Sequence, residues 1–548
     1  MRNYETFRRD GPDLPDGHAR GPGGVAAAGK PRVGVAPRGS GQRPPCAPRG
    51  PRTPRAIRRQ VLVNLAAGLA CVAVGSCLGW PSPILDRMSS KHWRWPGVGL
   101  ERGGGLGPPR PLSTDEASWV VSLMDLGIVL GSLPAGWAAD RWGRRPVLLS
   151  CAPMFVASWL LVLAAQGPEF LYAARLLQGL ASSVAMVVTA MYAGEVSDDG
   201  LRGANSAMVA MLLTLGTVVS YSVGPYVTYR AFAVSLLGVP ALFVLCFCWA
   251  PESPYWLLVQ GRRLEAEHAL RYLRDAGSCP LRVCAEADRI EAGIMEASDA
   301  AARSSPSSAS SGGLLASFRE LLVVPGPDRA AFALVITLTS LQALSGSDPM
   351  TAYSAVTLPN GFVLGANEVV IFFGVVSTLS TGVGAVLMDR AGRRPLLIAF
   401  SALQFASLLA SAVYYTLDER TTLDMSVPEW VWVPPAALVL YGVSYPIGLG
   451  CVPNTLQVEL FSTRVKGVAL PAILVSFNAL TFLVSKLYQV VWDAWGKDVA
   501  FWFFTADCLL AVVVATALLK ETKGKSFPEI QDLLDSRRKR RSAPTWPS

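Results

Sequence analysis

The amino-acid sequence predicts an all-α membrane protein with twelve transmembrane helices arranged as two six-helix halves. Of its 548 residues 51% are apolar and only 16% are charged, against about 25% charged residues in soluble domains. Apolar stretches of about 20 residues, long enough to cross a hydrocarbon core about 30 Å thick, recur from residue 57 to residue 519. Three loop motifs also occur twice, in the same order, in the two parts of the chain.

The twelve expected spans fall into two groups of six. The first half covers residues 57–250 and the second half residues 330–519. The spans are expected at 57–80, 118–138, 147–165, 169–193, 204–226 and 231–250, then at 330–351, 367–388, 395–416, 432–453, 467–491 and 498–519. Residues 251–329 form a polar cytoplasmic linker. Leucines among charges at 255–275 predict short amphipathic helices there, and the Ser-rich stretch at 298–313 is typical of a flexible connection.

The two ends of the chain differ from the spans in composition. Residues 1–56 are rich in Gly, Pro and Arg and contain few large apolar side chains. Such a segment cannot offset the entropy lost on ordering, so we expect a disordered N-terminal tail. Residues 520–548 form the second tail, whose basic run at 537–541 suits anionic lipid of the inner leaflet. The segment Glu529-Ile530-Gln531-Asp532-Leu533-Leu534 fits an acidic dileucine sorting signal or a packed amphipathic turn.

The distribution of Lys and Arg predicts the orientation in the bilayer. These residues gather in the loops that follow even-numbered spans, and the loop at about 86–115 is the one exception. By the positive-inside rule, both termini are expected in the cytoplasm. The plasma membrane is the expected location, with an endosomal or lysosomal membrane as the alternative. Because the net charge of +9 lies in the tails and short loops, it does not indicate nucleic-acid binding.

The internal repeat is the most informative feature of the loops. Asp140-Arg141-Trp142-Gly143-Arg144-Arg145 follows the second span of the first half, and Asp389-Arg390-Ala391-Gly392-Arg393-Arg394 follows the second span of the second half. Glu195 precedes Arg202 by seven residues, as Glu459 precedes Lys466. Glu252 and Glu521 follow the sixth span of each half. Parallel repeats of six helices are a recurring plan of transporters, with the binding site between the halves.

The repeated charges predict an ionic cluster in each half. We expect Arg144 and Arg145 to pair with Glu195 and Glu252. The equivalent set is Arg393 and Arg394 with Glu459 and Glu521. The aspartates are expected where Arg side chains and helix ends can hold them. Such clusters can act as gates at the cytoplasmic face; alternatively, the charges only fix the topology and contact lipid headgroups. The predicted gating set is Asp140, Arg141, Arg144, Arg145, Glu195, Arg202, Glu252, Asp389, Arg390, Arg393, Arg394, Glu459, Lys466 and Glu521.

These motifs resemble a known family. Together with the segment PESPYWLLVQGR at 251–262 and Arg175-Leu176-Leu177-Gln178-Gly179, they resemble the sugar porter branch of the major facilitator superfamily over about residues 57–535. The stretches 115–119 (DEASW) and 485–489 (SKLYQ) are most similar to the insect facilitated trehalose transporters and, more distantly, to the facilitative glucose transporters. The resemblance implies facilitative transport of a glucose-like or trehalose-like sugar by alternating access.

The resemblance also implies a central sugar site, which this chain alters. Gln342 matches a glutamine that hydrogen-bonds the sugar in the family, and Tyr353 matches an aromatic residue of the outer gate. Ala343 replaces a second glutamine, Asp348 replaces an asparagine, and Ser377 stands where an asparagine is usual. Asn454 replaces a tryptophan after Pro453, and Ala210 stands near a position that usually carries a glutamine. Asn478 is the remaining candidate contact. Alternatively, Gln342 forms a hydrogen bond between helices, as polar residues in membrane helices often do.

Four ionisable residues fall inside expected spans: Asp125, Asp348, Lys486 and Asp507. A charge there costs about 2.5–3.5 kcal/mol on insertion scales, so it tends to pair, to face water or to have a role. Asp348 and Asp125 are candidates for binding a proton or a cationic group. For Lys486 and Asp507 a structural role is the alternative, with Lys486 paired to an acid on a neighbouring helix. Gly75-Ser76-Cys77 stands where proton-coupled relatives carry an acid, which favours passive transport.

The sequence indicates a carrier and not an enzyme. It contains no nucleophile–base set, no phosphate-binding loop and only three histidines, so no catalytic residue, cofactor or metal is expected. The expected partners are a small solute, most simply a sugar, and the lipid bilayer, with the monomer as the functional unit. Three alternatives stay open: a proton-coupled symporter, a carrier of a non-sugar solute such as a cation, and a non-transporting sugar sensor.

Overall fold

The computed structural model describes residues 53–91, 93, 95, 111–198, 200–275, 280–303, 327–359, 365–421, 429–461, 463–525 and 529. Within these ranges, the side chains of residues 280, 297–303, 327, 458 and 463–468 are not described. Met1–Pro48 and Arg49–Ser548 form separate units, and all the described residues belong to the second. Residues 1–52 of the predicted N-terminal tail, residues 304–313 of the Ser-rich stretch and most of the C-terminal tail lie outside the described residues. Residues 54–56 and 298–303 are helical, so the disordered tail and the flexible connection were predicted a few residues too long.

The described part of the chain is helical and contains twelve helices long and apolar enough to cross a membrane. The predicted fold class and the number of spans are thus confirmed. The first half consists of α1 (Pro54–Gly79), α2 (Pro81–Ser89), α3 (Thr114–Trp142), α4 (Arg144–Leu163), α5 (Pro168–Val196), α6 (Arg202–Val223), the short helix η1 (Gly224–Tyr226) and α7 (Tyr229–Phe247). Helices α1 and α2 together form the first span, which is broken at Trp80.

The second half repeats this arrangement. It consists of α12 (Pro327–Leu344), α13 (Ser347–Thr357), α14 (Ala366–Ala391), α15 (Arg393–Arg420), α16 (Val433–Ile447), α17 (Val452–Glu459), α18 (Thr463–Trp495) and α19 (Lys497–Leu518). Its first span is also broken, between α12 and α13, where Gly346 adopts a φ of +82° that favours glycine. A second break lies between α16 and α17. Discontinuous membrane helices of this kind are typical of transporter binding sites.

Three helices form most of the linker: α8 (Pro254–Val259), α9 (Arg263–Arg274) and α10 (Pro280–Arg303). They share a small apolar core that includes Trp256, Leu270 and Ala287. This group is tied to the first half, because Arg59 on α1 donates to the Tyr272 carbonyl oxygen at 3.0 Å and Arg274 donates to that of Val196 at 3.1 Å. The amphipathic helices expected at 255–275 correspond to α8 and α9.

Within the first half, glycines permit close helix crossings. A Cβ atom on Gly127 of α3 would lie 2.8 Å from the Gly179 Cα of α5. One on Gly75 of α1 would lie 2.9 Å from the Leu213 carbonyl carbon of α6. Small residues at such crossings let membrane helices associate through their backbones.

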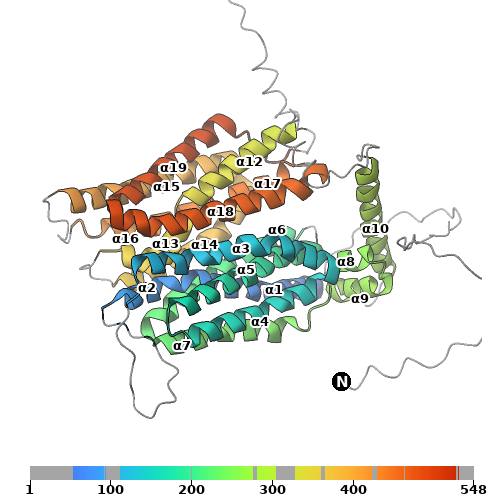
Figure 1. The fold of residues 1–548 in the computed structure, drawn as a ribbon. Helices are drawn as coiled ribbons and strands as arrows, with labels where there is room; N and C mark the ends of the chain where they lie inside the picture. Colours follow the sequence, from blue (N-terminus) through green and yellow to red (C-terminus); the bar gives the residue numbers. More distant parts are fainter. Residues whose placement is uncertain are drawn as a thin grey trace, which may run out of the picture. The chain divides into compact units, whose positions relative to one another are not determined.

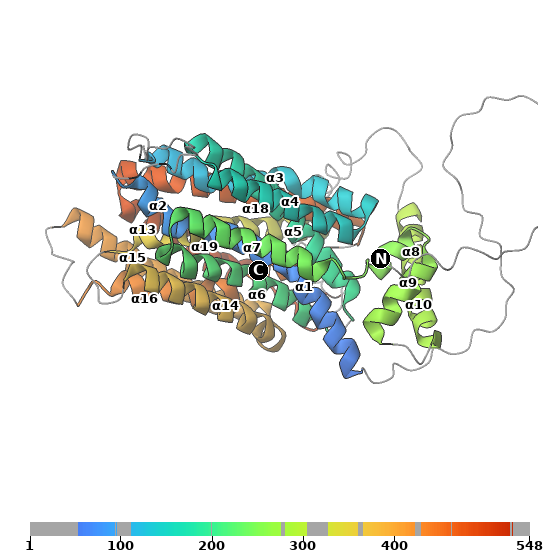
Figure 2. The same cartoon turned by 90° about the horizontal axis from the view of Figure 1, so that it is seen from below.

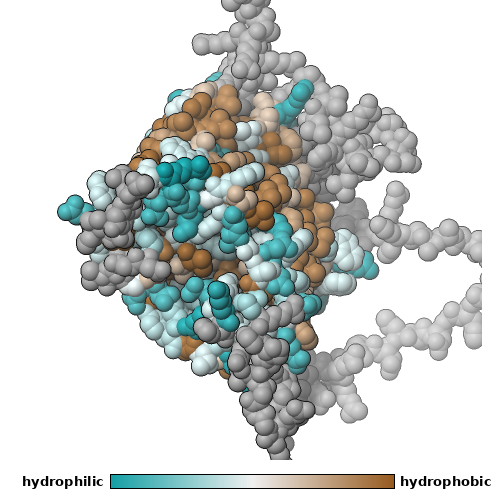
Figure 3. Space-filling view, turned by 60° about the vertical axis from the view of Figure 1, so that its left-hand side comes forward, coloured by the Kyte–Doolittle hydropathy of each residue, from teal (hydrophilic) through white to brown (hydrophobic). Residues whose placement is uncertain are grey.

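The two halves lie side by side along three helix pairs. Helix α18 packs against α3, α14 against α6, and α13 against α2 (Figures 1 and 2). Many outward-facing residues are large and apolar, among them Leu133, Leu245 and Leu379, as expected for contact with lipid. On the face shown in Figure 3, hydrophilic side chains lie in several places between apolar ones.

The duplicated loops define the two ends of the bundle. The α3–α4 and α14–α15 turns carry the Arg pairs and are separated by six spans, so they lie at the same end. We call this end the basic end. The other end carries α2, η1 and α13, and we call it the opposite end.

Candidate transport site

The ionic cluster of the first half is centred on Arg144. This side chain is 4% exposed, and its Nη2 lies 2.8 Å from Glu195 Oε1 and 3.1 Å from Asp140 Oδ1. Its Nε donates to Glu195 Oε2 at 2.9 Å, and its Nη1 donates to the Ala139 carbonyl oxygen at 3.1 Å. Ser253 also donates to Glu195. The structure therefore brings together three of the residues that the sequence grouped, with the Arg144 charge fully engaged.

Glu252 contacts the cluster in another way than expected. Its carboxylate accepts the backbone N–H groups of Arg144 at 3.0 Å and of Arg145 at 3.1 Å, at the first turn of α4. The side chain of Arg145 instead donates to the Cys248 carbonyl oxygen. The expected side-chain pair of Arg145 with Glu252 was wrong, because the carboxylate caps a helix N-terminus. Burial raises the pKa of Glu252, although the backbone N–H groups oppose this.

The second half repeats these contacts. Arg393 Nη2 lies 2.7 Å from Glu459 Oε1 and 4.0 Å from Asp389 Oδ1. Glu521 accepts the backbone N–H groups of Arg393 at 3.1 Å and of Arg394 at 3.0 Å. The Arg394 side chain donates to the Thr516 carbonyl oxygen at 2.9 Å, so its expected side-chain pair with Glu521 was also wrong. Burial acts to raise the pKa of Glu521, but the backbone N–H groups outweigh it and the pKa is lowered.

The remaining residues of the duplicated motifs lie at the rim of the basic end. Arg141 is exposed, with its guanidinium 5.8 Å from the centre of the Trp137 ring. Arg202 donates to the Gly194 carbonyl oxygen at 3.2 Å. Arg390 is exposed, and its carbonyl oxygen accepts Lys523 Nζ at 2.5 Å. The side chain of Lys466 lies outside the described part. The described ion pairs of these two clusters each join residues of a single half.

Contacts between the halves lie at the opposite end. Ser82 Oγ of α2 is 3.0 Å from Ser354 Oγ of α13, and Tyr221 donates to the Thr351 carbonyl oxygen at 2.7 Å. Tyr226 donates to Glu368 at 3.0 Å, just beyond α6. These bonds close the halves against each other at this end.

Lys486 makes a further contact between the halves. Its Nζ lies 2.5 Å from Asp115 Oδ1 and 2.7 Å from Ser118 Oγ on α3. The same ammonium group lies 4.4 Å from the centre of the Trp119 ring, within the range of a cation–π interaction. The structure thus places Lys486 beside an acid on a neighbouring helix, as the sequence analysis expected if Lys486 has a structural role. We call Lys486, Asp115, Ser118 and Trp119 the α3–α18 latch.

Two of the residues expected at the sugar site meet at the break between α16 and α17. Gln342 is 4% exposed, and its Nε2 lies 3.4 Å from the Gly450 carbonyl oxygen. Asn454, which is exposed, donates to the same oxygen at 2.9 Å. Gln342 Oε1 has no hydrogen-bond partner among the described residues. A buried amide oxygen without a partner is available to a ligand.

The other expected site residues are more dispersed. Tyr353 is 1% exposed, its hydroxyl has no partner among the described residues, and its ring centre lies 5.3 Å from that of Tyr488. Asn478 donates to the Leu474 carbonyl oxygen of its own helix at 2.8 Å. Ser377 Oγ faces α16, since a Cβ on Gly442 would lie 2.8 Å from it. The sequence did not predict which of these polar groups would be satisfied within the protein.

The acids inside the spans occupy different surroundings. Asp348 is half-buried and accepts Ser347 Oγ at 3.2 Å. Asp125 is 4% exposed, and its electrostatic neighbours include Asp348 of the other half. Asp507 is 7% exposed, and its Oδ2 has no hydrogen-bond partner in the described part of the chain.

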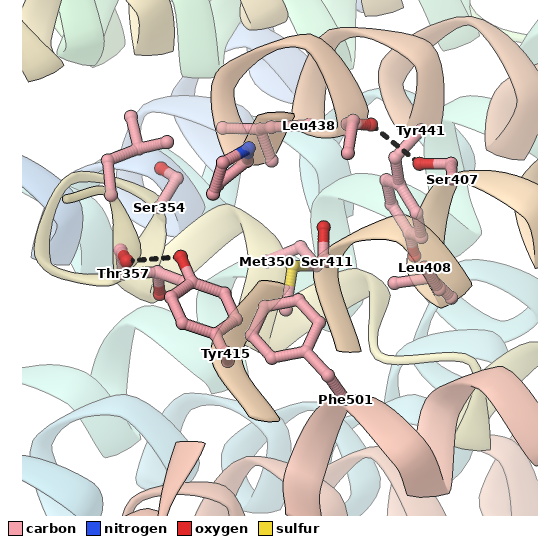
Figure 4. Close-up of a pocket in the computed structure, with 13 residues that line it drawn as sticks. Met350, Ser354, Thr357, Ser407, Leu408, Ser411, Tyr415, Leu438, Tyr441 and Phe501 are labelled. Atoms are coloured by element: carbon pink, nitrogen blue, oxygen red, sulfur yellow. Dashed lines mark hydrogen bonds between the residues drawn. The ribbon is translucent and has the colours of Figure 1, made fainter. Parts of the chain in front are cut away.

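Two pockets are described, and neither contains the expected sugar-site residues. One lies within the second half, between α13, α15, α16 and α19 (Figure 4). It has room for about 20 Å³, enough for about one water molecule. The other is a hollow of about 350 Å³ at the basic end, lined by Arg145, Glu252, Trp256 and their neighbours. The central sugar pocket therefore stays a prediction.

Arg175 is a buried charge to which the sequence assigned no role. It is 2% exposed, and its Nη1 donates to the Cys77 carbonyl oxygen of α1 at 2.7 Å. Its Nε donates to the Val120 carbonyl oxygen of α3 at 2.8 Å. The signal in the sequence was Pro81, four residues after Cys77, because proline lacks the N–H that would have bonded that carbonyl.

Comparison with known proteins identifies the family. The profile of the family "Sugar (and other) transporter" matches residues 86–534. The chain belongs to the sugar porter family of the major facilitator superfamily. This sugar porter is 28% identical to the facilitated glucose transporter member 8 of Bos taurus over 88% of its own length and 96% of that protein. It is 25% identical to the facilitated trehalose transporter Tret1 of Apis mellifera ligustica, over 88% and 89% of the two chains.

Solved structures agree on the fold. The inward open conformation of the xylose transporter XylE from E. coli aligns with a TM-score of 0.66 at 18% identity, covering 86% of this sugar porter and 99% of that chain. The proton:xylose symporter XylE bound to 6-bromo-6-deoxy-D-glucose aligns with a TM-score of 0.65 at 17% identity, over 87% of this chain and 100% of that one. Both confirm the predicted superfamily fold. The resemblance of the loop motifs to the sugar porters is confirmed by the family profile.

Proposed function

We propose that this sugar porter moves a glucose-like or trehalose-like sugar across the plasma membrane by facilitated diffusion, with the two halves alternating in access. The basic end lies in the cytoplasm in this proposal. The observation that carries it is the placement of the polar contacts. The described bonds between the halves lie at the opposite end, whereas the described ion pairs of the duplicated clusters stay within one half.

This distribution matches one state of a rocking transporter. A bundle that is held together at the opposite end can open at the basic end without breaking a described ion pair of the clusters. The Arg144 and Arg393 clusters then brace each half as a rigid body. This refines the expected gate, because a gate across the basic end would need pairs between the halves. The α3–α18 latch must break when the opposite end opens.

Gln342 and its surroundings support a polar solute. An uncharged sugar needs amide, carbonyl and hydroxyl groups that replace water around its own hydroxyls. Gln342 Oε1, which has no hydrogen-bond partner among the described residues, is a group of this kind near the broken helices. The Asn454 amide and the Ser347 hydroxyl bond within the protein, so a sugar would have to replace those bonds. Glucose and trehalose are the first candidates because they occur in the names of the relatives.

A counterflow measurement tests the proposal. Purified protein in liposomes preloaded with unlabelled sugar is given labelled glucose, trehalose or another solute from a panel. Glucose or trehalose is expected to accumulate transiently. Gln342→Leu is expected to lower the rate about tenfold, in line with the loss of a polar contact worth about 1.4 kcal/mol. Gln404→Leu removes another buried glutamine, on α15, and serves as the matched control.

The outcomes separate the alternatives. If Gln342→Leu accumulates sugar at the wild-type rate, the site assignment is refuted but sugar transport is not. Sugar binding without any counterflow would refute transport and favour a sensor. If no sugar moves but a cationic solute accumulates, the proposed substrate class is wrong.

A second candidate function rests on the acids of the two halves. Asp348 and Asp125 are electrostatic neighbours contributed by opposite halves, and the Arg175 charge also acts on Asp125. Two carboxylates at membrane depth favour binding of a proton or a cation, which the Arg175 charge opposes. Proton coupling is favoured if uptake at a fixed sugar concentration rises with an imposed pH gradient. This rise should be absent in Asp348→Asn. Uptake that is indifferent to the gradient favours facilitated diffusion.

A further inference from the structure

The break in the first span frees a backbone carbonyl. In a continuous helix the N–H of residue 81 would donate to the Cys77 carbonyl oxygen, but Pro81 has no N–H. An unpaired backbone group inside a membrane protein is costly, so it must be satisfied by another donor. Arg175 supplies that donor, with Nη1 at 2.7 Å from the Cys77 oxygen.

The break in the first span of the second half also leaves a carbonyl without its helical donor, although here Gly346, with a φ of +82°, turns the chain as well. Pro349 lies four residues after Ser345, so the Ser345 carbonyl oxygen also lacks its helical donor. The Tyr441 hydroxyl donates to this oxygen at 3.3 Å. Arg175 lies on α5 and Tyr441 on α16, and each helix belongs to the fourth span of its half. Two unlike side chains therefore perform one task at equivalent positions.

The partners of Arg175 agree with such a role. Its hydrogen bonds run to uncharged oxygens: the carbonyls of Cys77, Val120 and Val121 and the amide of Gln178. Within the described residues it forms no salt bridge. The guanidinium has several donors in a fixed plane, so one side chain can join α1 and α3 to α5. This arrangement holds the end of α1 in place.

We infer that Arg175 and Tyr441 are positioning residues that replace the backbone donors missing at Pro81 and Pro349 and so fix the angles of α2 and α13. These two short helices meet between the halves, where the Ala355 N–H lies 3.4 Å from Ser82 Oγ and Ser82 lies 3.0 Å from Ser354. Their angles therefore decide how the opposite end closes. The consequence for transport rests on the proposed alternating access.

The native cysteines provide a test that needs no transported solute. Cys77 adjoins the break and Cys151 lies on α4 of the same half; both are 0% exposed. Purified full-length protein is treated with N-ethylmaleimide, and each cysteine is followed by peptide mass spectrometry. Arg175→Met is expected to speed alkylation of Cys77 about ten- to hundredfold, the loss expected for a hydrogen bond to a charged group. Cys151 is expected to stay protected.

The proline supplies the decisive control. Pro81→Ala restores an N–H that can bond the Cys77 carbonyl, so Pro81→Ala combined with Arg175→Met is expected to protect Cys77 again, to within about threefold of wild type. If alkylation of Cys77 and of Cys151 speeds up equally in Arg175→Met, the inference is overturned, because the whole first half has then become less tightly packed. So would a double variant that remains as reactive as Arg175→Met.

Transport distinguishes positioning from support of the fold. In the double variant the backbone bond straightens the break, so Cys77 is protected while counterflow stays at least about tenfold below wild type. If the double variant recovers both the protection of Cys77 and the wild-type rate of counterflow, the positioning role is overturned. In the second half, Tyr441→Phe removes only a hydroxyl and is expected to raise hydrogen–deuterium exchange of 346–357. Unchanged exchange in Tyr441→Phe would refute the equivalence of the two breaks.

Discussion

At the scale of single residues, equal charges in the two clusters have unequal surroundings. Glu252 and Glu521 each accept the first N–H groups of a helix, yet burial raises the pKa of Glu252 while backbone N–H groups lower that of Glu521. Because the folded-state pKa of Glu521 lies below its ordinary value of 4.5, its charge stabilises the fold above that pH. That contribution is lost as the pH falls.

The matched substitutions Glu521→Gln and Glu252→Gln test this difference. At pH 7, Glu521→Gln is expected to lower the melting temperature by about 1–3 °C, as a carboxylate at a helix N-terminus contributes roughly 0.3–1 kcal/mol. Glu252→Gln is expected to cost less, because a raised folded-state pKa gives stability that falls as the pH rises through it. Thermal unfolding from pH 4 to pH 8 should show the two variants converging at the acidic end. Parallel curves would contradict the assignment.

The residue-level predictions succeeded where charge alone decides the contact. Arg144 with Glu195 and Arg393 with Glu459 are opposite charges at equivalent loop positions. The contacts of Glu252 and Glu521 escaped prediction because a pattern of charged side chains does not include the N–H groups of a helix terminus. The hydrogen bond of the Asn478 side chain was not predicted for a related reason, since it is donated to a backbone carbonyl of its own helix.

At the scale of elements, hydropathy predicted the spans but not their breaks. The apolar run continues through Trp80, Gly346 and Gly448, so the average over 20 residues is unaffected by a lost hydrogen bond. Pro81 and Pro349 carry the missing information, because each removes the donor for a carbonyl four residues earlier. The helix that supplies a replacement donor cannot be read from that local pattern, since it depends on tertiary packing.

Helix crossings of the first half give a second prediction. Gly127→Ala would place a Cβ against the Leu176 carbonyl oxygen and 2.8 Å from the Gly179 Cα, and a backbone cannot move aside as a flexible side chain can. Overpacking of this kind costs about 1–3 kcal/mol. Gly136→Ala on the same helix meets nothing within 4 Å and is expected to change stability by less than about 0.5 kcal/mol. Thermal unfolding of the two variants measures both losses of stability. Equal losses in the two variants would contradict the prediction.

At the scale of the whole molecule, two kinds of described ion pair bear on the proposed change of state. The clusters at the basic end hold each half together internally, so under the proposed alternating access they persist when the halves tilt. The pair of Lys486 with Asp115 joins the halves, so under the proposed alternating access it exists only while the opposite end is closed. A membrane protein that must change state uses both kinds: bonds that make rigid bodies, and weaker bonds between the bodies that can exchange with water.

The α3–α18 latch should therefore set the balance between states. Lys486→Asp places two acids together and is expected to shift the equilibrium toward opening of the opposite end about five- to thirtyfold. This corresponds to about 1–2 kcal/mol for a partly exposed ion pair and a cation–π contact. Fluorophores on unnatural amino acids at Ser89 and Thr421, both exposed at the opposite end, report the separation of the halves. The charge exchange Asp115→Lys with Lys486→Asp should restore most of the closed population. An unchanged distance distribution in Lys486→Asp would show that the other contacts between the halves hold this end closed without the latch.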